Sequence, residues 1–402
     1  MRILLVSWEY PPVIEGGLGR HVRKLSEHLV RDGIEVHVLT RGGGRLPAEA
    51  DQHGVIVHRV RVGGWESQFP KDPSAFVRWV DAMNADMHAL AAELCDRFEF
   101  DLVHSHDWLV AGAAERAARS IERPWLVTVH ATEYGRHQGW VQNHPQSHIH
   151  ATERAMVRRA DHVITCSRYM RVHVANVFGI RPAKVTAIPN GVDPRDLEPV
   201  AADLEALRAK YAAPEELLVL LVGRLVYEKG FHLALDALAP VVRRIGGVRF
   251  VVAGTGTAEA ELKRQAGRLG LADHGVFLGW VGDDMLHSLY RVSDLCIVPS
   301  TYEPFGIVAL EAMASGCLCV VADTGGLREV VPVDGTVGLR FPSRDATALR
   351  AVLERVLLDD RARAQLVAEA REHVLRFGWA EVAQRTGEVY DALTAGAITR
   401  AG

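Results

Sequence analysis

Residues 217–231 read LLVLLVGRLVYEKGF, and this stretch contains the pattern that decides the fold. The apolar run at 217–222 predicts a buried strand, a loop with Arg224 and Lys229 follows it, and helical spacing covers 230–242. Short apolar runs alternate with longer amphipathic stretches along the whole chain, which is typical of β/α units around a parallel sheet. The sequence therefore predicts an α/β protein.

The predicted elements form two series. The first has strands at 3–7, 35–40, 55–60, 102–105, 126–130, 162–165 and 185–188, with helices at 19–31, 75–98, 109–120 and 148–159. The second has strands at 217–222, 249–253, 276–278, 295–299 and 319–322, with helices at 230–242, 258–269, 284–293 and 305–314. We expect flexible segments at 42–51 and 63–73.

The turn-rich run PNGVDP at 189–194 separates the two series. We therefore predict an N-terminal Rossmann-like lobe at 1–193, a C-terminal Rossmann-like lobe at 194–376, and a helix within 377–402 that crosses back onto the first lobe. Two such lobes imply parallel sheets that face a central cleft.

The composition narrows the class of protein. The 402 residues carry a formal charge of −4, so no global basic field favours nucleic acid or an anionic membrane as partner. No apolar run approaches the roughly 20 residues that span a bilayer. The first residues read better as a strand than as a signal peptide, and five cysteines in apolar surroundings suit a reducing compartment. We predict a cytoplasmic protein without a transmembrane segment, and its oligomeric state stays open.

Arg224 and Lys229 place two cations at the carboxyl end of a strand, where open α/β sheets bind ligands. Guanidinium forms bidentate bonds to phosphoryl oxygens, and ammonium supplies a point charge. We interpret the pair as a diphosphate site. The alternatives are plain solvation of each side chain or a pairing with Glu228.

Residues 300–311, STYEPFGIVALE, place two carboxylates eight residues apart across a predicted helix start. Pro304 suits the first helical position, so Glu303 would lie at the helix entrance and Glu311 about two turns deeper, given a rise of about 1.5 Å per residue. The two acids can then reach different parts of one elongated ligand. Taken alone, such a pair is much better explained by a helix N-terminal acid and a solvated second acid.

Glycines and polar side chains follow several other strands. Gly16-Gly17 and Gly325-Gly326 can each present backbone N–H groups to a ligand or simply form tight turns. Gly254-Thr255-Gly256 lacks the third glycine of a dinucleotide motif, which argues against a nicotinamide dehydrogenase.

Histidines also stand at predicted strand ends, in the segments 104–108 and 128–133, where polar groups could meet sugar hydroxyls. For His104 and His106 we expect one buried and one partly exposed ring. A metal site is not predicted, because no third ligand stands at usable spacing.

Together these motifs make the chain resemble the retaining, nucleotide-sugar-dependent glycosyltransferases with the GT-B fold that include bacterial glycogen synthases. The resemblance covers nearly the whole chain, and its motifs occur in the family's order: Gly16-Gly17-Leu18, His106-Asp107-Trp108, Thr128-Val129-His130, the run at 189–193, Gly223-Arg224-Leu225 with Lys229-Gly230, Glu303 with Glu311, and Thr324-Gly325-Gly326-Leu327. In character the chain is most similar to bacterial α-1,4-glucosyltransferases.

The resemblance implies a role for each matching residue. Arg224 and Lys229 would stabilise the leaving nucleoside diphosphate, Glu311 would bind the ribose, and Glu303 would bind donor-sugar hydroxyls. Further contacts to the donor would come from the residues His130, Asp107, Gly16, Gly17, Gly325, Gly326 and Leu327. The base would be read by backbone near Val281.

These roles predict an enzyme that transfers a hexosyl unit to an oligo- or polysaccharide acceptor such as an α-1,4-glucan, with no cofactor and no metal. Glycogen synthases carry a lysine shortly before the Gly-Gly pair, where this chain has Glu15, so we expect UDP-glucose as donor, ahead of ADP-glucose and GDP-mannose. The alternatives are a UDP-sugar 2-epimerase of related fold and a non-catalytic sugar-binding protein.

Overall fold

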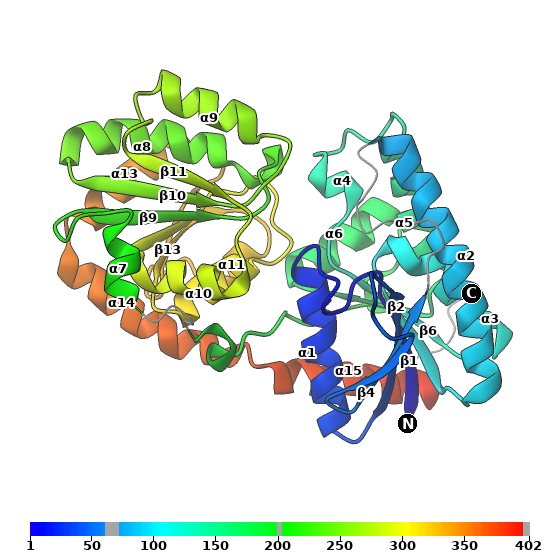
Figure 1. Ribbon diagram of the computed structural model, residues 1–402. Helices are drawn as coiled ribbons and strands as arrows, with labels where there is room; N and C mark the ends of the chain where they lie inside the picture. Colours follow the sequence, from blue (N-terminus) through cyan, green and yellow to red (C-terminus); the bar gives the residue numbers. More distant parts are fainter. Residues whose placement is uncertain (61–71, 199–202, 397–402) are drawn as a thin grey trace. The chain divides into compact units, whose positions relative to one another are not determined.

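The computed structural model describes residues 1–60, 72–198 and 203–396, and the elements below are those of this part of the chain. The chain divides into two compact units (Figure 1). The first comprises Met1–Gly191 together with Trp379–Gly402, and the second comprises Val192–Gly378. Each unit is a sheet with helices packed against it, so the predicted α/β class with two parallel-sheet lobes is confirmed.

The first unit contains an eight-stranded sheet in the order β3-β4-β2-β1-β5-β6-β7-β8. Its strands are β1 (Arg2–Val6), β2 (Glu35–Arg41), β3 (Glu49–Gln52), β4 (Val55–Val60), β5 (Leu102–His106), β6 (Trp125–Val129), β7 (His162–Thr165) and β8 (Val185–Ala187). All neighbours pair in parallel except β3, which is antiparallel to β4.

The helices of the first unit are α1 (Gly17–Arg31), α2 (Pro73–Arg97), α3 (Ala111–Ser120), α4 (Glu133–Arg136), α5 (Gln146–Arg159), α6 (Arg168–Phe178) and α15 (Trp379–Thr394). Helix α15 lies beside α1, and the two helices cross in Figure 1. Trp379, Ala383 and Tyr390 of α15 share one buried apolar cluster with Leu25 of α1 and Leu5 of β1. The last helix therefore belongs to the core of the first unit.

The second unit contains a six-stranded sheet in the order β11-β10-β9-β12-β13-β14, and all of its strand pairs are parallel. The strands are β9 (Leu217–Val222), β10 (Val248–Ala253), β11 (Gly275–Gly279), β12 (Leu295–Val298), β13 (Leu318–Asp323) and β14 (Leu339–Pro342). The helices are α7 (Leu204–Ala209), α8 (Phe231–Ile245), α9 (Glu259–Arg268), α10 (Asp283–Val292), α11 (Ile307–Ala314), α12 (Leu327–Val330), α13 (Ala346–Leu357) and α14 (Asp360–His373). Because the strands are parallel, the loops at their carboxyl ends lie along one edge.

The apolar run that predicted β9 is the centre of the second core. Leu218, Val219, Leu220 and Leu221 are all fully buried, as a strand covered on both faces requires. Burying one such side chain contributes about 1.5–3 kcal/mol relative to leaving it exposed. None of the helices in the described ranges is both long and apolar enough to cross a membrane.

Two predictions about local structure are wrong. The segment 42–51 was expected to be flexible, but β3 begins at Glu49. Its polar sequence gave no strand signal, and β3 forms because the edge of β4 offers unpaired backbone groups. The helix predicted at 305–314 begins only at Ile307, after Gly306 with φ 116°. Most of the other segment expected to be flexible, 63–73, lies outside the described residues.

Candidate active site

The parallel sheet of the second unit gathers most of the predicted donor-binding residues along one edge. Arg224 and Lys229 follow β9, Val281 follows β11, Glu303 follows β12, and Gly325 follows β13. These four strands belong to one all-parallel sheet, so their carboxyl ends share an edge. In open α/β sheets this is the edge that binds ligands.

The loop that carries Arg224 is held in place by the loop after β10. The Leu225 N–H donates to the carbonyl of Thr255 at 2.8 Å, and the Ala258 N–H donates to the carbonyl of Leu225 at 2.8 Å. A Cβ at Gly256 would lie 2.3 Å from the Leu225 carbonyl oxygen, so the residue must be glycine for the loops to touch. The partial dinucleotide-like motif at Gly254-Thr255-Gly256 therefore serves to pack this loop against the loop that carries Arg224.

Arg224 and Lys229 differ in their surroundings. The Arg224 side chain is 55% exposed, with one guanidinium nitrogen 3.8 Å from Glu228 Oε1. Lys229 ends a short 3-10 turn, Tyr227–Lys229, and its Nζ lies 2.8 Å from Glu303 Oε2. Helix α8 begins two residues later at Phe231, so Lys229 lies in the loop before the helix.

Glu303 is buried and fixed through both its side chain and its main chain. Ser300 Oγ donates to Glu303 Oε2 at 3.0 Å, and the Gly326 N–H donates to the Glu303 carbonyl at 2.9 Å. A Cβ at Gly326 would lie 2.4 Å from Phe305 Cα, which explains the glycine. Because α11 starts at Ile307, Glu303 is a loop residue four positions before the helix rather than its first acid.

Glu311 lies in the second turn of α11 and is 9% exposed. Its Oε2 accepts a hydrogen bond from the Tyr290 hydroxyl of α10 at 3.0 Å. Burial, followed by the nearby charge of Glu311, raises the pKa of Tyr290 well above its ordinary value. The phenol therefore stays protonated and orients the carboxylate.

Leu327 and Val281 occupy different surroundings on this edge. Leu327 is fully buried at the start of α12, and a Cβ at Gly306 would lie 2.6 Å from its Cδ2. Gly325 adopts φ 52°, a conformation that glycine tolerates. Val281 is partly exposed in the loop between β11 and α10, beside Trp280, whose side chain is 76% exposed.

In the first unit, a glutamate accepts hydrogen bonds from the glycine-rich loop. Glu9 is 2% exposed, and its Oε2 accepts from the N–H of Glu15 at 2.7 Å and of Gly16 at 3.0 Å. Gly17 is the first residue of α1. Burial raises the pKa of Glu9, and the two backbone N–H groups oppose that rise. The Glu9 carboxyl group therefore already accepts hydrogen bonds from the glycine-rich loop that the resemblance assigns to the donor.

Asp107 and His130 follow adjacent strands, β5 and β6, and are joined directly. Asp107 Oδ1 accepts from the His130 N–H at 2.8 Å. Burial raises the pKa of Asp107 to about 6 despite that hydrogen bond. Burial, followed by the charge of Arg136, lowers the pKa of His130 to about 4. His130 is therefore neutral near pH 7.

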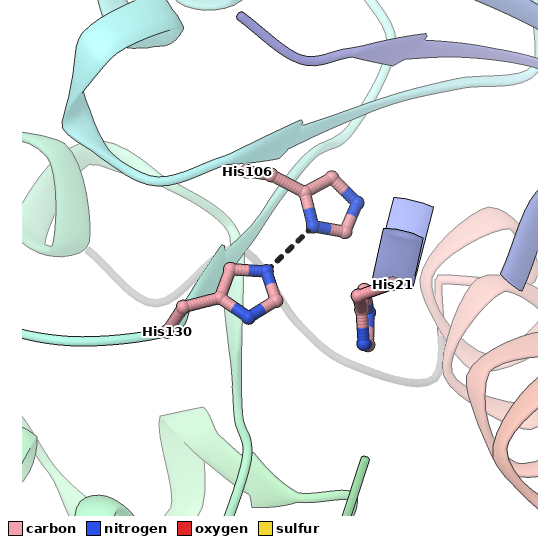
Figure 2. Close-up of side chains that lie close together, drawn as sticks. All are labelled: His21, His106 and His130. Carbon is pink, nitrogen blue, oxygen red and sulfur yellow. Dashed lines mark hydrogen bonds between the residues drawn. The ribbon is translucent and has the colours of Figure 1, made fainter. Parts of the chain in front are cut away.

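Both His104 and His106 are completely buried, with ring centroids 4.5 Å apart, so the expectation of one partly exposed ring is wrong. The two residues are spaced by two on β5 and so face the same side of the sheet. The hydroxyl of Tyr390, on α15, pairs with His104 Nδ1 at 2.8 Å. His106 Nδ1 lies 2.9 Å from His130 Nε2, and Figure 2 shows His21 facing this pair.

Comparison with known proteins identifies the family. Residues 15–196 match the family model "Glycosyltransferase Family 4", and residues 203–373 match "Glycosyl transferases group 1". A glycogen synthase of Mycobacterium tuberculosis is 40% identical over 98% of this chain and 96% of its own length. The chain belongs to the GT-B glycosyltransferases. A D-inositol 3-phosphate glycosyltransferase of Xylanimonas cellulosilytica is 31% identical over 94% of this chain and 92% of its own length.

Solved structures agree with the assignment of this chain to the GT-B glycosyltransferases. Sucrose-phosphate synthase from Thermosynechococcus elongatus matches with a TM-score of 0.81 and 27% identity, over 98% of this chain and 99% of that one. The catalytic domain of starch synthase IV from Arabidopsis thaliana shares the fold with a TM-score of 0.78 and 20% identity, over 98% of this chain and 99% of that one.

Sequence reasoning missed several residues that contact the candidate site residues within each unit of the glycosyltransferase. Tyr290 and Ser300 orient the two glutamates, and Glu9 holds the glycine-rich loop. His21 gave no signal because a single histidine within a helix is unremarkable. The spacing of His104 and His106 was the one sequence pattern that indicated a group of histidines in this part of the first unit.

Proposed function

We propose that this glycosyltransferase moves an α-glucosyl unit from UDP-glucose to a carbohydrate acceptor such as an α-1,4-glucan, with retention of anomeric configuration. The observation that carries the proposal is the contact of Lys229 with Glu303 beside Arg224 at the carboxyl edge of the second sheet. The likeness to a glycogen synthase supports a glucan acceptor.

Negative charge builds on the departing diphosphate during transfer, and preorganised cations lower the barrier by stabilising that charge. Arg224 can form bidentate bonds to phosphoryl oxygens, and Lys229 supplies a fixed point charge. The bond to Glu303 at 2.8 Å limits the orientations of the ammonium group. In this proposal the two cations perform the role that a metal ion plays in other transferases, so no metal is required.

The remaining donor contacts follow from the positions of the residues in each unit. Glu311, oriented by Tyr290, binds the ribose hydroxyls, and Glu303 binds hydroxyls of the donor sugar. The base is read by backbone near Val281, while Gly325, Gly326 and Leu327 line the sugar. From the first unit, this proposal assigns Asp107 and His130 to the sugar and Gly16 and Gly17 to phosphate. A phosphate contact at Gly16 requires Glu9 to release the N–H that it now accepts.

Retention requires that the acceptor hydroxyl attack on the face from which the diphosphate leaves. The C1–O bond to phosphate breaks as the bond from C1 to the acceptor oxygen forms. The departing phosphate takes the proton of that hydroxyl, so the products are the glycosylated acceptor and the nucleoside diphosphate. This route needs no nucleophile from the protein.

A donor panel tests the proposal. UDP-glucose, ADP-glucose and GDP-mannose are each incubated with the enzyme, with and without short α-1,4-glucans, and nucleoside diphosphate release is measured. We expect acceptor-dependent release with UDP-glucose, and product NMR should show an α linkage. If nucleoside diphosphate were released only from ADP-glucose, the donor would be ADP-glucose instead of UDP-glucose. Conversion of UDP-sugar without net UDP release would indicate an epimerase, and no release from any donor would refute the transfer reaction.

A further inference from the structure

Three histidines from separate elements of the first unit meet in one place, where His21 and His106 are buried and His130 is partly exposed. His21 lies on α1, His106 ends β5, and His130 directly follows β6. One ring nitrogen from each lies within 4.8 Å of those of the other two. Ring centroids are 5.5 Å apart for His21 and His106, 4.7 Å for His21 and His130, and 5.2 Å for His106 and His130. Figure 2 shows the three imidazoles around one shared space.

Two nitrogens of this cluster have no hydrogen-bond partner. His106 Nε2 and His21 Nδ1 are both buried without a partner, although His21 is 6% and His106 0% exposed. An unmet polar atom in such a place costs about 1–3 kcal/mol. The folded protein bears this cost at two nitrogens of the same cluster. A ligand that accepts lone pairs from several imidazoles would remove it.

The ligand set consists of imidazoles. A neutral imidazole keeps a lone pair on one ring nitrogen and can donate it to a metal ion. Among the described residues, no carboxylate or thiol joins the set. Asp107, the nearest acid in sequence, directs Oδ1 to the main chain of His130.

We infer that His21, His106 and His130 form a binding site for a divalent transition metal such as Zn²⁺ or Co²⁺. Three imidazoles suit these ions and not Mg²⁺ or Ca²⁺, which prefer oxygen ligands. Bonds of about 2.0–2.1 Å place tetrahedral ligand nitrogens roughly 3.3 Å apart, so nitrogens as far apart as 4.8 Å must approach each other by roughly 1.5 Å. A water molecule completes the fourth position, as in sites with three protein ligands.

The surroundings supply support for the ligands. The ring of Trp379 packs edge-on to His21 at 5.3 Å, and the side chain of Asn190 is close enough to influence the pKa of His21. Asn190 Oδ1 is a further buried atom without a partner. It offers an acceptor for the N–H that a metal-bound His21 would present, and such outer contacts orient metal-binding histidines.

The site would affect transfer as well as bind metal. His130 is assigned to the donor sugar, so a metal on its ring should compete with the donor. This consequence rests on the proposed function, whereas metal binding itself does not. The site is distinct in chemistry from the diphosphate cations Arg224 and Lys229 of the other unit.

The test uses untagged, chelator-treated full-length protein titrated with Co²⁺, followed by displacement with Zn²⁺. We expect one equivalent of Co²⁺ to produce the intense visible absorption of tetrahedral coordination, and Zn²⁺ to abolish it. Calorimetry then gives the Zn²⁺ affinity. His21→Gln, His106→Gln and His130→Gln should each weaken it by more than the roughly 10- to 100-fold that loss of an outer partner costs.

His37→Gln is the matched control. His37 and His58 are also buried, and their ring nitrogens form a hydrogen bond of 2.9 Å, yet no third imidazole among the described residues forms a cluster with them. This variant should bind Co²⁺ like the parent. Circular dichroism checks the fold of each variant, and if His106→Gln fails to fold, the other two decide. Absence of tetrahedral Co²⁺ absorption, or an equal loss in His37→Gln, would overturn the site even if the enzyme transfers glucose. Zinc binding without competition against the donor would instead contradict the placement of His130 in the reaction.

Discussion

Lys229 and Glu303 are 74 positions apart in sequence, and the Lys229 ammonium contacts the Glu303 carboxylate at 2.8 Å. Their side chains are 23% and 11% exposed, so the pair is only partly screened by water. The contact joins the loop after β9 to the loop after β12, which are neighbouring strands of the second sheet. A cation proposed for the diphosphate and an acid proposed for the sugar are therefore positioned by each other.

Replacement of Lys229 by alanine tests the cation. Lys229→Ala should lower kcat by roughly 100- to 1000-fold, the loss typical for one preorganised group that stabilises developing charge. Steady-state kinetics with the preferred donor measure the effect, and thermal unfolding checks the fold. Lys263→Ala is the control, since Lys263 forms an ion pair with Glu259 on the surface of α9. Full activity in Lys229→Ala would contradict its role with the leaving group.

Tyr290→Phe tests whether the phenol orients Glu311. Without the hydroxyl, Glu311 loses a charge-assisted hydrogen bond worth about 1.5–3 kcal/mol. We expect the donor KM to rise roughly tenfold or more while kcat changes less, because binding of the ribose is affected rather than the reacting bond. Tyr10→Phe, which removes a longer contact to Ser26 in the other unit, should leave KM unchanged. Equal kinetics for the two variants would show that Glu311 needs no positioning.

Glu9 should stabilise the glycine-rich loop. Glu9→Ala leaves the N–H groups of Glu15 and Gly16 without an acceptor, at a cost of about 1–3 kcal/mol in the free energy of unfolding. Glu9→Gln keeps one acceptor oxygen and should lose less. Denaturant unfolding followed by near-UV circular dichroism measures both. If Glu9→Ala were as stable as the parent, the carboxylate would not be what holds the loop.

Gly230 should be irreplaceable for steric reasons. It adopts φ 68°, and a Cβ there would lie 2.0 Å from the Pro299 carbonyl oxygen. Gly270 has a similar φ of 73° but open space around its Cβ. Gly270→Ala should therefore cost only the roughly 1–2 kcal/mol of a left-handed residue. Gly230→Ala should cost more and also reduce turnover by displacing Lys229, and comparable stability of the two variants would refute this account.

Acid should destabilise the first unit before the second. Burial lowers the pKa of His58, His130, His162 and His173, all in the first unit, to about 4. Between pH 6.5 and 4 the unfolded chain then binds more protons at these sites, so stability falls as the pH falls, by about 1.4 kcal/mol per unit of pKa difference. The carboxyls of Glu9, Asp107 and Glu153, whose pKa burial raises, oppose this trend. In the second unit the pKa is lowered for two histidines among the described residues, His232 and His373.

Hydrogen exchange read by mass spectrometry at pH 7 and pH 5 assigns protection to each unit. Faster opening of β5 and β6 at pH 5, with little change in β9 and β12, is the expected outcome. Loss of protection first in the second unit would contradict the assignment. The comparison is internal to one chain, so it needs no variant.

The sequence by itself determined the two α/β series. Buried parallel strands require continuous apolar runs, and the helices between them require apolar residues at helical spacing, so both are visible in the sequence. The strand β9 was predicted to its end residues, and the motifs at strand ends lie at the edge where open α/β sheets bind ligands. Strand β3 was missed because its polar residues pair through backbone atoms that carry no sequence signal. Helix α11 starts late because Gly306 adopts a positive φ that no residue pattern announced.

Only the tertiary structure decided which of these side chains meet. Lys229 contacts Glu303 because β9 and β12 are neighbours although two strands separate them in sequence. In the same way, His21, His106 and His130 converge because β5 and β6 are neighbouring strands and His21 of α1 packs against the two rings at their ends. Local spacing describes one element at a time, whereas parallel strands are joined by crossovers that place distant residues side by side. The order of strands in the sheet therefore decides which residues of the candidate site lie together.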